Sequence, residues 1–295
     1  MGGEQRGLLR PISLSPSSKQ RKEVIASLPL DRLTQQAQQR IMTVAKSPTL
    51  YRRLPTQAIR CDRDMFLFLS RNPEVLVGIW DLMGITNVQT QRTGPYHLSA
   101  TDGVGTHCNV ELIYGDPNLH IYVADGYYDG RLATKPIHGK GLFVMRSSYA
   151  PSQDGGTTVT GTLDCFVQIE SLGADLVART LSGVIGRSAD NNFIETARFM
   201  AQVSQASAQN SPAMINVARR MPQVTPTAKS QFEQLVRKIA QQASLQTPRP
   251  SMQTPRPSMQ TPTGSMQGPR STMQTPRSTM QTPRATMQSA GQYNR

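Results

Sequence analysis

The clearest pattern of apolar and polar positions lies between Thr106 and Tyr127. Side chains alternate in character along 106–114 and again along 119–127, which is typical of paired strands with one buried face. The residues 115–118, Gly-Asp-Pro-Asn, favour a turn between them. Counting from that turn predicts the pairs Tyr114–Leu119, Leu112–Ile121, Val110–Val123 and Cys108–Asp125. One face is then apolar except near Asp125, and the other is mostly polar, with His107, Asn109, Glu111, His120 and Tyr122.

Helices and further strands are expected on both sides of this hairpin. Before it we expect a strand at 56–61, a helical turn capped by Asp62, and a helix from Asn72-Pro73 to Met83. After it come strands at 141–149 and 158–170 and a long helical stretch from Leu172 to about Ser207. Gly183 and Gly186 are expected to bend or interrupt that stretch. A further helix is expected at 228–240.

The pattern divides the chain into five parts. Residues 1–29 are polar and basic and are expected to be a disordered arm, followed by a short helical lead-in at 30–50. The folded domain is expected at 51–210. A basic linker with one amphipathic helix follows at 211–243, and a disordered repeat tail occupies 244–295.

The tail repeats with a period of seven residues. A methionine recurs from Met252 to Met287 and a proline from Pro248 to Pro283 at this interval. A coiled coil also has a period of seven, but a proline in every repeat removes backbone donors and prevents a continuous helix. The tail also carries four Thr-Pro-Arg copies that are possible phosphorylation sites, at Thr247, Thr254, Thr275 and Thr282.

The positive charge of the chain lies mainly in its flanks. The formal net charge is +13, yet residues 51–210 hold 13 Lys/Arg and 15 Asp/Glu. Attraction to a polyanion or a membrane surface is therefore expected of the flanks and not of the domain. In the tail we assign it to five arginines, Arg249, Arg256, Arg270, Arg277 and Arg284. An inert spacer or a regulated peptide ligand are the alternative roles of this segment.

The three cysteines do not predict a disulfide framework or a structural zinc site. Cys61, Cys108 and Cys165 are far apart, and no Cys/His spacing typical of zinc occurs. We predict no metal site and no cofactor.

The first twenty residues have no apolar signal region, and no stretch is long and apolar enough to span a bilayer. A cytoplasmic location is the resulting expectation.

The order of elements resembles the START-like superfamily of helix-grip proteins, which includes the birch-pollen allergen and polyketide cyclase families. The resemblance covers about residues 51–207 and rests on element order and on the stretch 163–170, Leu-Asp-Cys-Phe-Val-Gln-Ile-Glu, running into the last helix. It implies an α+β helix-grip fold with a curved antiparallel sheet of about six to seven strands around a long C-terminal helix. It also implies a cavity between them for an apolar ligand, with disordered flanks outside the domain.

The candidate ligand-binding residues are those expected on the apolar sheet face and on the helix opposite it. They are Cys108, Val110, Leu112, Ile121, Val123, Asp125, Arg146, Cys165, Val167, Leu181 and Ile185. Asp125 is the most unusual member, because a carboxylate directed inward needs a partner, and Arg146 is the candidate. The alternative is that both lie at the solvated rim. No catalytic residue is assigned, since the adjacent His107 and Cys108 point to opposite faces of one strand.

Three functions remain open at this point. The first is non-enzymatic binding or carriage of a hydrophobic small molecule or lipid, with the basic tail for localisation. The second is a cyclase or hydrolase on the same fold, which would need facing polar groups such as Asp125, Arg146 or Glu170. The third is a scaffold that binds nucleic acid or acidic partners through its basic flanks.

Overall fold

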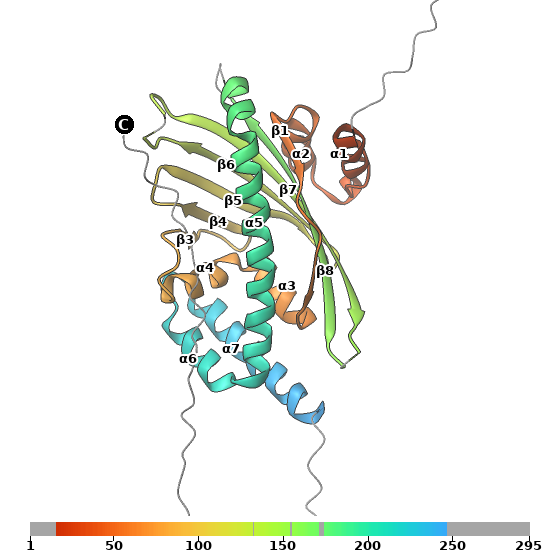
Figure 1. Cartoon of the computed structure of the whole chain (residues 1–295), viewed down its shortest axis with the longest axis vertical. Helices are drawn as coiled ribbons and strands as arrows, with labels where there is room; N and C mark the ends of the chain where they lie inside the picture. The colour runs from red at the N-terminus through yellow and green to blue at the C-terminus, as the bar shows by residue number, and fades with distance from the viewer. Residues whose placement is uncertain (1–15, 132, 154, 171–173, 247–295) are drawn as a thin grey trace, which may run out of the picture. The chain divides into compact units, whose positions relative to one another are not determined.

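The computed structural model describes residues 16–131, 133–153, 155–170 and 174–246. In this part of the chain an α+β fold is built from one open antiparallel sheet and seven α-helices (Figure 1). The helices are α1 (Pro16–Ala26), α2 (Gln35–Lys46), α3 (Arg63–Arg71), α4 (Pro73–Leu82), α5 (Ala174–Gln209), α6 (Ser211–Arg220) and α7 (Pro226–Gln246), with a 3-10 turn η1 (Leu30–Arg32). The strands are β1 (Leu50–Arg53), β2 (Gln57–Arg60), β3 (Gln89–Arg92), β4 (His97–Thr101), β5 (Thr106–Gly115), β6 (Leu119–Tyr128), β7 (Ile137–Pro151) and β8 (Thr157–Ile169).

The sheet has the order β1-β8-β7-β6-β5-β4-β3, and β2 also pairs with β8. This is eight strands instead of the six or seven expected from the resemblance. The short strands β1, β3 and β4 escaped the sequence analysis because four or five residues show too little alternation to be recognised. The long helix α5 crosses one face of the sheet, as predicted, and it continues through Gly183 and Gly186 without a break (Figure 1).

A bulge between Leu112 and Tyr114 sets the register of β5 against β6. Gly115 pairs with His120 and Tyr114 with Ile121, but Leu112 pairs with Tyr122. The predicted pair Tyr114–Leu119 was therefore wrong by two residues. The other three were wrong by one, since Leu112, Val110 and Cys108 lie opposite Tyr122, Ala124 and Gly126. A slip of one residue moves a strand's whole side-chain set to the other face of the sheet.

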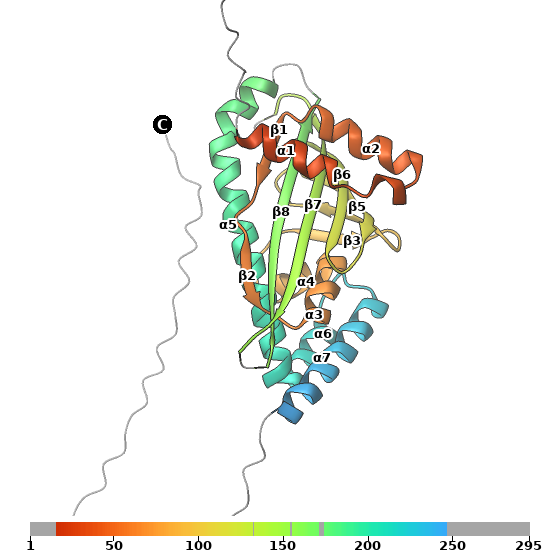
Figure 2. The same ribbon diagram turned by 90° about the vertical axis from the view of Figure 1, so that its right-hand side faces the viewer.

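Over β6 to β8, the outer face of the sheet, which faces away from α5, is covered by α1 and α2 (Figure 2). Ile121, Val123, Leu142, Val144 and Phe166 form one buried cluster with residues of the two helices, Val24, Leu28, Ile41, Val44 and Ala45. The predicted disordered arm at 1–29 is thus helical from Pro16 to Ala26 and buries Val24. Residues 1–15 lie outside the described part.

A buried carboxylate fixes this outer layer. Asp164 is fully buried and accepts hydrogen bonds from Arg53 Nε (2.8 Å), Arg146 Nη1 (3.0 Å) and the Tyr51 hydroxyl (2.8 Å). Arg146 also donates to Ser27 Oγ, just after α1. A buried charge is tolerated only when it is paired and hydrogen-bonded, so this network joins β1, β7 and β8 to the N-terminal helices.

The second core lies at one end of the inner face, which is the face toward α5. It combines Val159 of the sheet with α3, α4, the C-terminal half of α5, α6 and α7, and its largest members include Met65, Leu69 and Phe232. The segment 211–243, expected as a linker, is therefore two helices of this core. Among the described residues, no helix is both long and apolar enough to cross a membrane.

The register makes a testable prediction about the two faces. Ile121→Ala should lower the free energy of unfolding by about 2–5 kcal/mol, because it removes a fully buried side chain from a packed cluster. Leu112→Ala should cost less than about 2 kcal/mol, because Leu112 is only half-buried on the inner face. Urea unfolding of the two variants measures both values. Equal losses, or a larger loss for Leu112→Ala, would contradict the observed register.

Candidate ligand-binding site

The inner face of β5 to β8 carries an apolar wall that belongs to neither buried cluster. Its side chains are all half-buried, and neither cluster of the described residues includes them. We call this set the inner wall: Cys108, Val110, Leu112, Ala124, Phe143, Leu163, Cys165 and Val167. Apolar side chains that a fold leaves out of its packed cores are typical of ligand-binding surfaces.

The middle of the inner wall lacks large side chains. One row across the strands runs Val110–Ala124–Gly141–Val167, and the next runs Cys108–Gly126–Gly139–Ile169. On β6 and β7 these rows hold only glycine and alanine. The space over Gly141 is partly filled by the ring of Phe143, since a Cβ added at Gly141 would lie 2.8 Å from Phe143 Cε2. The centre of the wall is therefore formed by small residues, with larger apolar side chains around it.

Helix α5 faces the inner wall and is fixed at two points. Arg52 of β1 forms an ion pair with Asp190, and its Nε lies 2.8 Å from Asp190 Oδ1. Further along the helix, Met200 and Val203 are buried in the core at the C-terminal half. The side chains of 171–187 are outside the described residues, and these include the predicted ligand contacts Leu181 and Ile185.

Polar groups close the end of the inner wall where α3 meets α4. The Tyr122 hydroxyl donates to the Ser70 carbonyl (2.7 Å), and Arg71 Nε donates to His120 Nε2 (3.2 Å). Beside them Arg92 forms a close pair with the buried Glu74 (Nε–Oε1 2.6 Å). These contacts fix both helices against β3 and β6.

His120 is a neutral histidine at this end. Burial, with the neighbouring Arg71 cation, lowers its pKa from 6.5 to about 4. It accepts at Nε2, and its buried Nδ1 has no hydrogen-bond partner in the described structure.

Five of the predicted site residues belong to the inner wall, namely Cys108, Val110, Leu112, Cys165 and Val167. Four others, Ile121, Val123, Asp125 and Arg146, lie on the outer face and do not. The one-residue register error explains this outcome. The chosen residues of β5 and β6 were predicted to share one face, but those of β5 lie on the inner face and those of β6 on the outer face.

Asp125 and Arg146 are not partners. Asp125 lies half exposed and pairs with Arg40 of α2 (Nη2–Oδ2 3.3 Å), while Arg146 pairs with Asp164. The candidate pairing of Arg146 with Asp125 was wrong.

Sequence reasoning missed Ala124, Phe143 and Leu163 of the wall and Arg71, His120 and Tyr122 at its end. Alternation in 141–149 and 158–170 was visible and could have indicated Phe143 and Leu163. Nothing in the sequence pairs Arg71 with His120, because that contact depends on where α3 packs.

The thiols of the wall are not activated nucleophiles. Burial raises the pKa of Cys165 to about 12 and also raises the pKa of Cys108. A cysteine acts as a nucleophile through its thiolate, so both side chains behave as small apolar groups at neutral pH. No cluster of three or more His, Cys, Asp or Glu side chains suited to a metal ion occurs among the described residues.

Comparison with known proteins gives similarity in structure only. The sequence matches no family model and no curated protein. A conserved protein from Geobacillus kaustophilus shares 13% identity over 52% of this chain and 96% of its own, with a TM-score of 0.36. Ara h 8.0201 shares 9% identity over 50% of this chain and 99% of its own, with a TM-score of 0.28. The di-domain ARO/CYC BexL from the BE-7585A biosynthetic pathway shares 15% identity over 71% of this chain and 58% of its own, with a TM-score of 0.25.

The environment of His120 predicts a pH dependence of stability. Its folded-state pKa of about 4 lies below the ordinary 6.5, so the unfolded chain takes up a proton first as the pH falls. Stability from this residue is complete above pH 6.5 and declines toward pH 4, by an amount on the order of 3 kcal/mol.

Urea unfolding of the native chain and of His120→Gln at pH 7.5 and 4.5 measures this difference. The variant should lose less stability on acidification than the native protein. His97→Gln, at an exposed position on β4, serves as the control. An NMR titration that places the pKa of His120 near 6.5 would contradict the prediction.

Proposed function

We propose that the protein binds an apolar small molecule or lipid between the inner wall and α5, without changing it chemically. The observation that carries this proposal is the row of half-buried apolar side chains around Ala124 and Gly141, which neither core of the described residues includes. Hydrophobic ligands bind in concave, mostly apolar sites with a few polar groups that fix their orientation. The helix-grip resemblance of residues 51–207 supports the same placement of the ligand.

The polar end of the wall supports a ligand with one polar terminus. Arg71 is exposed and Tyr122 is half-buried, and both come from elements that border the wall. A long apolar body would lie along Val110, Leu112 and Val167, and its polar group would lie toward Arg71.

The residues that favoured an enzyme lie elsewhere. Asp125 and Arg146 are on the outer face, and Glu170 pairs with Lys140 at the end of β8. General acid–base catalysis needs a group within hydrogen-bond reach of the bound substrate. Binding therefore accounts better than catalysis for the groups that border the wall.

Ala124→Phe tests the binding site directly. The added ring should occupy the space over the small residues at the centre of the inner wall and weaken binding by roughly tenfold or more, or ~1.4 kcal/mol. Native mass spectrometry of the full chain, followed by organic extraction, measures the fraction that carries an added mass of lipid size. Ser148→Phe is the matched control, since it places the same ring at an exposed position of β7.

Loss of the bound mass in Ala124→Phe but not in Ser148→Phe, with both variants folded, is the expected result. A native chain that carries no added mass and takes up none from fatty-acid micelles would refute the proposal. So would equal binding by both variants.

A second candidate function, binding of polyanions, is favoured by the arginine-bearing repeats of the tail. Residues 247–295 contain six arginines. If all six contacted phosphates, the logarithm of the affinity for duplex DNA would fall with the logarithm of the salt concentration at a slope of roughly −5. Fluorescence anisotropy with the full chain and with a variant lacking 247–295 measures this. Unchanged binding after the deletion would exclude the tail as the source.

A further inference from the structure

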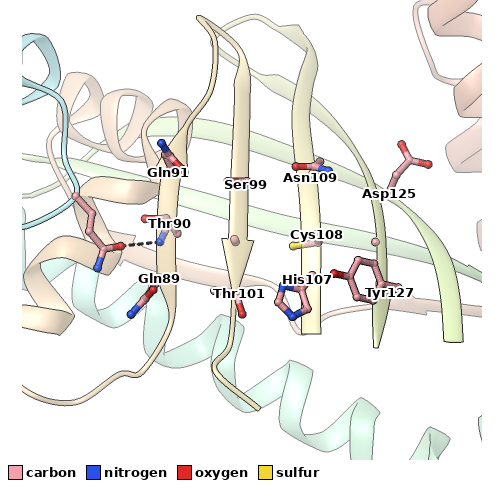
Figure 3. Close-up of a pocket in the computed structure, with 13 residues that line it drawn as sticks. Gln89, Thr90, Gln91, Ser99, Thr101, His107, Cys108, Asn109, Asp125 and Tyr127 are labelled. Carbon is pink, nitrogen blue, oxygen red and sulfur yellow. Dashed lines mark hydrogen bonds between the residues drawn. The ribbon is translucent and has the colours of Figure 1, made fainter. Parts of the chain in front are cut away.

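The outer face of the sheet carries a depression, away from the inner wall. Helices α1 and α2 cover the outer face of β6 to β8, and the part over β3 to β6 is left uncovered by that cluster. A depression of about 680 Å³ lies there, and residues of β3, β4, β5 and β6 line it (Figure 3). We name it the outer trough.

Two rows of outward side chains border the outer trough, and the sheet backbone between them forms its floor. One row runs Gln89–Thr101–His107–Tyr127, and the other runs Gln91–Ser99–Asn109–Asp125 (Figure 3). The floor between the rows is the line Thr90–Ala100–Cys108–Gly126.

The lining is polar but almost uncharged. Amides and hydroxyls predominate, each able to donate and accept hydrogen bonds, and Asp125 is the one charged side chain among the described lining residues. An anion would find no lysine or arginine in this lining, and a purely apolar ligand would leave the amides without partners. A ligand with many neutral hydroxyl groups matches both properties.

The outer trough also offers an aromatic surface. Tyr127 is 37% exposed, and its ring stacks on His107 with 4.9 Å between centroids. An aromatic ring with a polar tip can pack against the C–H face of a sugar while its hydroxyl binds water or ligand. Asp125 forms an ion pair with Arg40 (Nη2–Oδ2 3.3 Å), which also pairs with Glu111, and its carboxylate stays half exposed beside the trough.

The sheet edge beside the trough is closed by Gln223. Its side-chain oxygen accepts a hydrogen bond from the Thr90 amide (2.9 Å), which satisfies a donor of the edge strand β3. The polar groups therefore project from paired strands with defined spacing, and sites on such elements are well preorganised.

We propose that the outer trough is a saccharide-binding site, separate from the apolar site on the inner face. The contacts that a neutral sugar needs are supplied by the ring of Tyr127, the amides of Gln89, Gln91 and Asn109, the hydroxyls of Ser99 and Thr101, and the carboxylate of Asp125. The ligand of this site is a neutral sugar of about two rings, in keeping with the size of the trough.

Saturation-transfer NMR on the full chain tests the proposal with four probes: maltose, cellobiose, lactose and N,N′-diacetylchitobiose. At least one should receive saturation. Asn109→Ala and Tyr127→Ala should each weaken its binding, by roughly fivefold or more for the loss of one contact pair. Gln35→Ala, which removes an exposed amide at the start of α2 outside the trough, should bind as the native chain does.

Ala124→Phe separates the two sites, because it should reduce lipid binding and leave sugar binding unchanged. Thermal unfolding of each variant establishes that it is folded. The proposal is overturned if none of the four sugars receives saturation. It is also overturned if Asn109→Ala and Tyr127→Ala bind as well as Gln35→Ala.

Discussion

The bulge between Leu112 and Tyr114 decides which side chains of the central hairpin face α5. With the bulge, Val110 and Leu112 join Ala124 and Phe143 on the inner face, and Ile121 and Val123 turn to the outer face. Without it, the side chains of β5 before the bulge would lie on the opposite face of the sheet relative to those of β6. The division into a packed outer side and an apolar inner wall depends on this one extra residue.

Because packing on the outer face stabilises the sheet, the inner wall does not have to be fully buried. Ile121, Val123 and Phe166 are buried by α1 and α2, and the buried Asp164 joins the same layers through Arg53 and Arg146. Burial of apolar surface is the main stabilising contribution in a domain of this size. Because the outer cluster and the helical core hold the fold, Val110, Leu112 and Val167 can remain only half-buried.

Much of the fold could be predicted from the sequence, because alternation and turn residues mark β5 to β8 and the period of 3.6 marks α5. The site could be predicted only in part. Register cannot be counted reliably from a turn when a bulge follows it, so Ile121 and Val123 were placed on the wrong face. The helices α1 and α6 were missed as parts of the fold because their polar composition hides the few residues, such as Val24 and Ala218, that become buried. Contacts such as Arg71–His120 depend on tertiary packing that no local pattern records.

The most direct test of the account is methyl NMR of the full chain with palmitate as the probe. Intermolecular NOEs from the acyl chain should reach the methyl groups of Val110, Leu112 and Val167 and should be absent at Ile121 and Val123. That result would establish the inner wall as the ligand-binding surface. NOEs to Ile121 or Val123, or no contact and no shift change at Val110, Leu112 and Val167, would contradict it.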